Sequence, residues 1–159
     1  MDGGLEKSLK PEFIDSFLEL FKFIYKDDAE ATRVSLELLK VIHVWDDLVD
    51  RDSVTTEQIN AAFSSALFEI SESWLWDAGA VALARVQYAK WRASNAIEQN
   101  KDATPENKAV AYVYRAGFFD LFCYFAYKLY GMEWVDTISP VIAMWYGEPI
   151  ESYESEFWS

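Results

Sequence analysis

The feature that most constrains the fold is the scarcity of residues that interrupt helices. The 159-residue chain has four prolines and six glycines, so long stretches run without the residues that end helices or form turns. Hydrophobic residues make up 52% of the chain, which excludes a disordered protein and implies a large core. These properties predict an all-α bundle of five or six helices, folded as a single domain over residues 1–159.

Capping signals and apolar spacing indicate where the helices lie. Asp28 can cap one helix, Thr55-Thr-Glu-Gln58 contains a capping box, and Thr104-Pro105-Glu106 is a strong start signal. Residues 1–10 and 148–159 are predicted to be loose termini, and Pro140 is expected to bend or split the last helix. The predicted helices cover about 11–26, 28–51, 55–70, 80–100, 104–130 and 132–145.

Charge and cysteine content narrow the possible environments and partners. A net charge of −13 argues against binding to nucleic acid or an anionic membrane, because both require clustered Lys and Arg. The single cysteine, Cys123, excludes a disulfide within the chain and a thiolate metal cage, and it favours a reducing cytoplasm. The most apolar stretch, Ala109–Tyr130, contains Arg115, Asp120 and Lys128, so we expect a buried helix there and no membrane span.

One strip of side chains predicts a metal site. His43, Asp46, Asp47 and Asp50 are offset by three, four and seven residues, which places them on one face of a helix. Carboxylates this close repel one another unless a cation neutralises them. We therefore expect Asp46, Asp47 and Asp50 to be ligands of Mg²⁺ or a similar divalent cation.

The same strip is also compatible with a solvated helix end. Upstream it continues into Leu36 and Leu39, so the acids replace core residues and would line a polar cavity. A solvent-facing acidic surface is the alternative. His43 could be an additional ligand, which would favour a transition metal over magnesium, or a hydrogen-bonding residue at the edge of the core.

A second strip could complete the site from another helix. Trp91, Ser94, Asn95 and Glu98 repeat the same offsets, and both Asn95 and Glu98 carry oxygen atoms of the kind that magnesium accepts. The alternative is an amphipathic helix with a uniform polar face.

Arg115 and Asp120 lie in the most apolar predicted helix and project about 140° apart on it, so they cannot be assumed to pair. A buried guanidinium needs anionic or carbonyl partners. Arg115 could neutralise the aspartates or hold an anionic group, and Asp120 could add to the pocket. A structural ion pair inside the bundle is equally compatible with the sequence.

Two resemblances extend this interpretation. Asp46-Asp47-Leu48-Val49-Asp50 resembles the Asp-Asp-x-x-Asp motif of isoprenoid synthases, in which the motif lies on a helix and holds magnesium ions that bind a substrate diphosphate. The chain is about half the usual length of that family and lacks its second metal-binding motif. The run Leu39–Asp52, the capped third helix and the Arg115…Asp120 element are similar to small helical proteins of tailed bacteriophages, which implies a viral origin, a host cytoplasmic location and no particular reaction.

Three functional hypotheses follow. The first is a magnesium site that binds or processes a phosphate or diphosphate of a small molecule. The second is a non-enzymatic acidic module that binds a basic host or phage protein. The third, an acidic mimic of DNA, ranks last because the charges gather at helix ends and in the tail instead of spreading over the surface.

Overall fold

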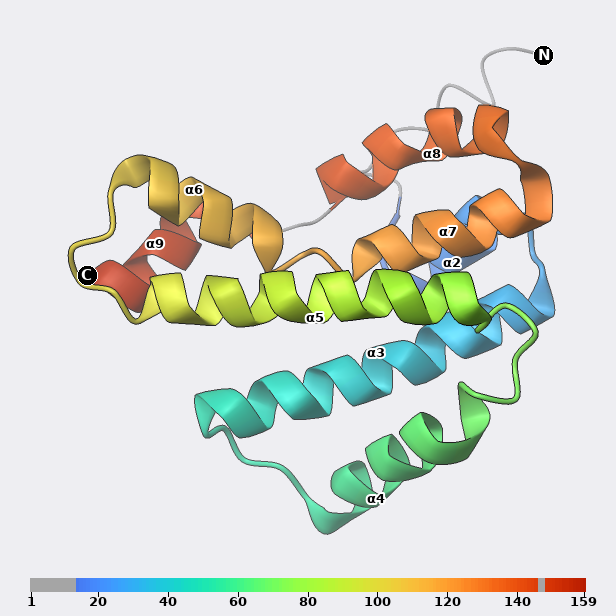
Figure 1. Ribbon diagram of the computed structural model, residues 1–159, viewed down its shortest axis with the longest axis horizontal. Coiled ribbons are helices and arrows are strands. Elements are labelled where there is room, and N and C mark those ends of the chain that lie inside the picture. The colour runs from blue at the N-terminus through green and yellow to red at the C-terminus, as the bar shows by residue number, and fades with distance from the viewer. Residues whose placement is uncertain (1–13, 146–147) are drawn as a thin grey trace.

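The computed structural model describes residues 14–145 and 148–159, and within these ranges it is entirely helical, which confirms the predicted class (Figure 1). Residues 1–10 and the helix start predicted at Pro11 lie outside the described part. The helices are α2 (Phe17–Ile24), α3 (Ala29–Asp50), α4 (Thr56–Ser64), which continues into a π-helical segment (Ser65–Glu69), α5 (Ala78–Glu98), α6 (Pro105–Tyr114), α7 (Phe119–Tyr130), α8 (Met132–Trp145) and α9 (Ile150–Trp158).

The predicted start signals are used as caps. The side chain of Asp28 accepts a hydrogen bond from the Ala31 N–H at the start of α3, at 2.9 Å. Thr55 and Thr104 each form a complete capping box, at the starts of α4 and α6. These bonds satisfy amide groups that have no partner inside the helix, so the local sequence determines where these helices begin.

The predicted count of five or six helices is too low, because the described residues form eight α-helices. The helix predicted over 104–130 is broken between Tyr114 and Phe119, where the chain makes tight turns such as the hydrogen bond from the Gly117 N–H to the Tyr114 carbonyl, at 3.0 Å. Gly117 weakens a continuous helix at this point. The break lets α6 lie over the end of α5 while α7 packs against α8.

The C-terminal segment predicted to be loose forms α9. Its Tyr153 is fully buried, and the Tyr153 hydroxyl donates a 2.9 Å hydrogen bond to Oε1 of Glu98. Tyr153 also contacts the rings of Tyr112 and Phe157. Because aromatic side chains bury a large apolar area, these contacts fix α9 on α6 and α5. Helix α8 continues through Pro140.

The core joins α2 and α3 to α7 and α8. Figure 1 shows α3 and α5 running side by side, with α4 on the outer side of α3 and with α6 and α9 over the left-hand end. Phe21 of α2 and Phe122 of α7 are fully buried and meet with their ring centres 4.8 Å apart. Within the described ranges, no helix has both the length and the apolar character needed to cross a membrane.

Candidate functional site: carboxylates around Arg115

Several carboxylates gather where α3 and α5 end, at the left of Figure 1. Asp46 and Asp50 lie in the last two turns of α3, and Glu98 is the last residue of α5. Neither helix has a basic residue in its last turn. The C-terminus of a helix carries partial negative charge, so acids there are unfavourable without a cation nearby.

Arg115, which follows α6 directly, supplies that cation. Its Nη1 atom lies 3.7 Å from Oε2 of Glu148, and the Arg115 side chain is only 17% exposed. The guanidinium carbon lies 5.0 Å from the ring centre of Tyr153 and 5.5 Å from that of Phe157, so two aromatic faces of α9 support the charge.

The charge of Arg115 acts on acids from several helices at once. It lowers the pKa values of Asp46 and Asp50 on α3, of Glu98 on α5 and of Glu156 on α9. We call this group, together with Glu148, the acidic end. Its members are Asp46, Asp50, Glu98, Glu148 and Glu156.

The single positive charge of Arg115 does not compensate the negative charge of the acidic end. Burial raises the pKa values of Asp46, Asp50, Glu98 and Glu156, and repulsion from neighbouring carboxylates raises them further, so that the net direction is upward in all four. For Asp46 the largest repulsion comes from Asp50, one helical turn away. The acidic end therefore retains a surplus of negative charge that a further cation would relieve.

The structure brings together some of the residues that the sequence analysis singled out. Asp46, Asp50, Glu98 and Arg115 lie close enough to act on one another electrostatically. Asp47 contributes repulsion to Asp46 and Asp50.

The remaining predicted residues lie elsewhere or play a smaller part. His43 is exposed, its ring centre is 6.0 Å from that of Phe17, and it weakly lowers the pKa of Asp46. Asn95 is half-buried on α5, where its backbone carbonyl accepts a hydrogen bond from the Gln99 N–H.

Asp120 belongs to a different part of the molecule. Its Oδ2 atom accepts a 2.7 Å hydrogen bond from Nε2 of Gln87. Arg115 instead forms an ion pair with Glu148, so the structural ion pair that the sequence left open as an alternative for Arg115 is present, with a partner other than Asp120.

Over the described ranges, no three side chains among His, Cys, Asp and Glu are grouped so that they could hold a metal ion. The oxygen donors of Asp46, Asp50 and Glu98 suit magnesium chemically. However, the cation that the structure places among them is the Arg115 guanidinium. The geometry thus favours charge compensation by an organic cation over a ready-made metal cage.

Two carboxylates of the acidic end and the two rings beside Arg115 were not identified from the sequence; they are Glu148, Glu156, Tyr153 and Phe157. They lie in the segment that was predicted to be loose. The signal that could have identified them is the four-residue spacing of Tyr153 and Phe157, which places both rings on one helical face.

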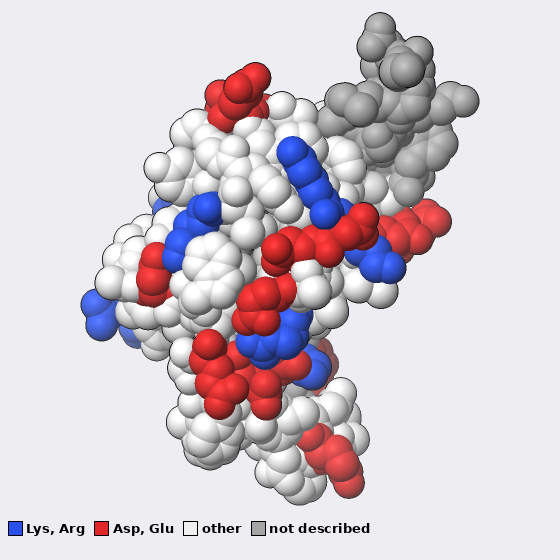
Figure 2. Space-filling view, turned by 90° about the vertical axis from the view of Figure 1, so that its right-hand side faces the viewer, with Lys and Arg blue, Asp and Glu red and all other residues white. Residues whose placement is uncertain are grey.

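The opposite end of the molecule has a different charge pattern. Figure 2 views the end where the α2–α3, α4–α5 and α7–α8 connections lie, and Lys and Arg side chains there lie directly beside Asp and Glu side chains. Arg33 pairs with Glu30 at 2.7 Å, and Lys128 pairs with Asp77 at 2.5 Å. Unlike the acidic end, this region contains acids that pair with individual bases.

Comparisons with known protein families, with curated proteins and with solved structures find no match for this chain. The resemblances to isoprenoid synthases and to phage proteins therefore remain predictions from the sequence.

The surplus charge predicts the effect of removing one carboxylate. We expect Asp46→Asn to stabilise the protein at pH 7 by roughly 0.2–0.5 kcal/mol, the size of one repulsive pair separated by four residues on a helix. The folded state raises the pKa of Asp46, so ionisation of this group costs stability. That cost disappears as the pH falls through the raised pKa, and below about pH 4 the variant and the wild type should be equally stable.

Thermal unfolding at pH 7 and at pH 4 measures this difference. Asp136→Asn, at an exposed position of α8, is the matched control and should leave the melting temperature unchanged at both pH values. A loss of stability in Asp46→Asn at pH 7 would show that the Asp46 carboxylate is compensated in the folded protein.

Proposed function

We propose that the protein is a non-enzymatic binding module whose acidic end binds a basic segment of a partner protein. The observation that carries this proposal is the environment of Arg115, a guanidinium held by two aromatic rings among carboxylates that still carry surplus charge. The contacts of Arg115 support a guanidinium or ammonium group as the kind of group that would bind here. An Arg or Lys side chain of a partner would contact the same carboxylates from the solvent side.

The exposure of the acids suits such a partner. Asp50 and Glu156 are exposed, and so is Asp52 just beyond the end of α3, whereas Asp46 is half-buried and Glu98 is buried. The exposed carboxylates can contact a basic peptide directly. The deeper ones contribute to the negative potential that attracts it. With a net charge of −13, the attraction should weaken as salt concentration rises.

A divalent cation is the second candidate, and one observation favours it. Asp46 and Asp50 repel each other, and both act on Glu98 across the gap between α3 and α5. A Mg²⁺ ion would relieve this repulsion and could polarise the oxygens of a bound phosphate or diphosphate. Without the metal, a phosphate would be repelled by the carboxylates around Arg115. The phosphate hypothesis therefore requires metal binding first.

Calorimetry with a short Arg-rich peptide tests the first proposal. We expect the double variant Asp46→Asn/Asp50→Asn to bind the peptide about tenfold more weakly than wild type, which corresponds to about 1.4 kcal/mol. The matched control, Glu133→Gln/Asp136→Asn, removes the same charge from exposed positions of α8 and should bind as wild type does.

An equal loss in both double variants would overturn the proposal, because it would show a general attraction to an acidic protein. The same proteins titrated with MgCl₂ and MnCl₂ test the second candidate. Metal binding that is present in wild type and absent only from Asp46→Asn/Asp50→Asn would favour the metal site. Peptide binding that survives this substitution would exclude the acidic end as the docking surface.

A further inference from the structure

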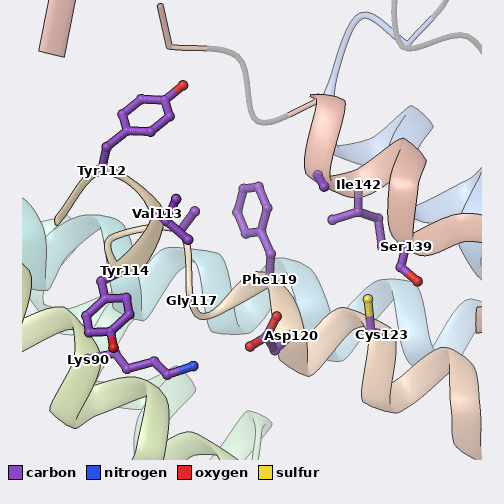
Figure 3. Close-up of a pocket in the computed structure, with 12 residues that line it drawn as sticks. Lys90, Tyr112, Val113, Tyr114, Gly117, Phe119, Asp120, Cys123, Ser139 and Ile142 are labelled. Carbon is purple, nitrogen blue, oxygen red and sulfur yellow. The ribbon is translucent and has the colours of Figure 1, made fainter. Parts of the chain in front are cut away.

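A cavity of about 410 Å³ lies beside the break between α6 and α7, with α8 along its far side (Figure 3). Its volume falls in the range of about 300–1,000 Å³ that is typical of small-molecule sites. The lining includes Val113 of α6, Phe119 of α7 and Ile142 of α8, and it is mostly apolar. None of the residues that form the acidic end lines this cavity.

Two opposite charges lie on the cavity wall. Lys90 comes from α5 and Asp120 from α7, and Figure 3 shows the Lys90 side chain pointing toward Asp120. Ion pairs are found elsewhere in the described structure, but these two groups do not form one with each other. The Lys90 Nζ atom lies 5.6 Å from the ring centre of Tyr114. The wall therefore presents a separated cation and anion next to an apolar surface.

A buried glutamine fixes the position of Asp120. Gln87 is 1% exposed, and its Nε2 atom donates to Oδ2 of Asp120 at 2.7 Å. Its Oε1 atom has no hydrogen-bond partner among the described residues, and it lies so close to Gly117 that a Cβ atom at position 117 would collide with it. A buried acceptor without a partner costs free energy. Gln87 thus leaves its Oε1 atom unpaired while its Nε2 atom holds Oδ2 of Asp120 in place.

We propose that this cavity binds a small apolar molecule with an amine and a carboxylate at one end, such as an apolar α-amino acid. The amine would contact Oδ1 of Asp120 and the carboxylate would contact Nζ of Lys90. The apolar side chain would then lie against Phe119 and Ile142. A ligand with only one of the two charges would desolvate Lys90 or Asp120 without pairing it, which is the physical basis of the selectivity.

Three related compounds test the charge requirement by calorimetry. L-Phenylalanine carries both charges, 3-phenylpropionate lacks the amine, and phenethylamine lacks the carboxylate. We expect phenylalanine to bind at least tenfold more tightly than either of the others. Lys90→Met should weaken phenylalanine binding about tenfold without weakening phenethylamine binding, because phenethylamine has no carboxylate to pair with Lys90. Asp120→Asn should likewise weaken phenylalanine binding without weakening phenylpropionate binding, because phenylpropionate has no amine to pair with Asp120.

The alkylation rate of the Cys123 thiol tests whether the ligand binds in this cavity. It lines the cavity and is the only cysteine in the chain, and burial raises the pKa of its thiol to about 11. Its alkylation by N-ethylmaleimide should therefore be slow and should accelerate at alkaline pH. Saturating phenylalanine should slow this alkylation at least fivefold, because the bound side chain would block access to the sulfur.

Two further variants keep the test decisive. Ala143→Trp fills the cavity from an exposed lining position of α8 and should abolish both binding and protection, while Arg85→Met, at an exposed position of α5, should change neither. Circular dichroism establishes that each variant is folded, and Lys90→Gln replaces Lys90→Met if the latter unfolds. Equal affinity for all three compounds would overturn the amino acid assignment. Absence of phenylalanine binding, or binding without protection of Cys123, would overturn the site.

Discussion

Replacing Arg115 with methionine is expected to destabilise the protein by roughly 2–4 kcal/mol at pH 7. This is somewhat less than the cost of breaking a fully buried ion pair. The reason for the large effect is that one guanidinium serves carboxylates from α3, α5, α9 and the segment before α9. The expected loss is smaller than for a fully buried ion pair because the Arg115 side chain is 17% exposed. Water near this position screens part of the repulsion between the carboxylates that remain after the substitution.

The destabilisation should depend on pH in a defined direction. Arg115 lowers the pKa values of Asp46, Asp50, Glu98 and Glu156, so its removal raises them further. A group whose folded-state pKa is raised stabilises the folded state as the pH falls through that pKa. The difference between Arg115→Met and wild type should therefore shrink between pH 7 and pH 4, as the carboxylates take up protons.

Urea unfolding across this pH range measures the effect. Arg85→Met removes an exposed arginine from α5 and should change the free energy of unfolding by less than about 0.5 kcal/mol. Adding Glu98→Gln to Arg115→Met should recover part of the loss, because it removes one of the uncompensated carboxylates. A pH-independent loss without recovery would mean that Arg115 acts through packing on Tyr153 and Phe157 alone.

Gly79→Ala is expected to destabilise the protein by roughly 1–3 kcal/mol, the range typical of overpacked sites. At an unconstrained helical position the same change would stabilise by up to about 1 kcal/mol. Here the new Cβ atom would lie 3.0 Å from Cζ of Tyr124 and would collide with the Tyr124 hydroxyl. That hydroxyl cannot move freely, since it donates a 2.7 Å hydrogen bond to Oδ1 of Asp77.

A double substitution separates the clash from other effects. In a Tyr124→Phe background the colliding oxygen is absent, so Gly79→Ala should cost at least 1 kcal/mol less there than in wild type. Thermal and urea unfolding of the four proteins provide the comparison. Equal costs in both backgrounds would show that the tyrosine hydroxyl does not limit the space at position 79.

The fold class and much of the acidic end could be predicted because both depend on local periodicity. The spacing of Asp46 and Asp50 places them on one helical face whatever the rest of the chain does. Asp and Thr residues at the predicted starts cap the helices through hydrogen bonds that span only three residues, as Asp28 and Thr55 show. Such features need no knowledge of which helices become neighbours.

The break before α7 could not be predicted in the same way. Gly117 alone weakens a helix without ending it, and the close approach of Gln87 to Gly117 that accompanies the break joins residues that lie far apart in the sequence. Helix α9 was missed for a similar reason, because the burial of Tyr153 depends on Glu98 and Tyr112. The cavity follows from the break, so neither Lys90 nor Gln87 could be recognised as part of a site.

The contrast between the two ends of the molecule has a consequence for how it meets other proteins. At one end of the long axis Arg33 and Lys128 form ion pairs with Glu30 and Asp77, whereas at the other end the carboxylates of the acidic end share the single guanidinium of Arg115. A positively charged partner would therefore be attracted locally, toward the carboxylates that have no individual base beside them. Encounters in which the ends of α3 and α5 face the partner would then be favoured over other orientations.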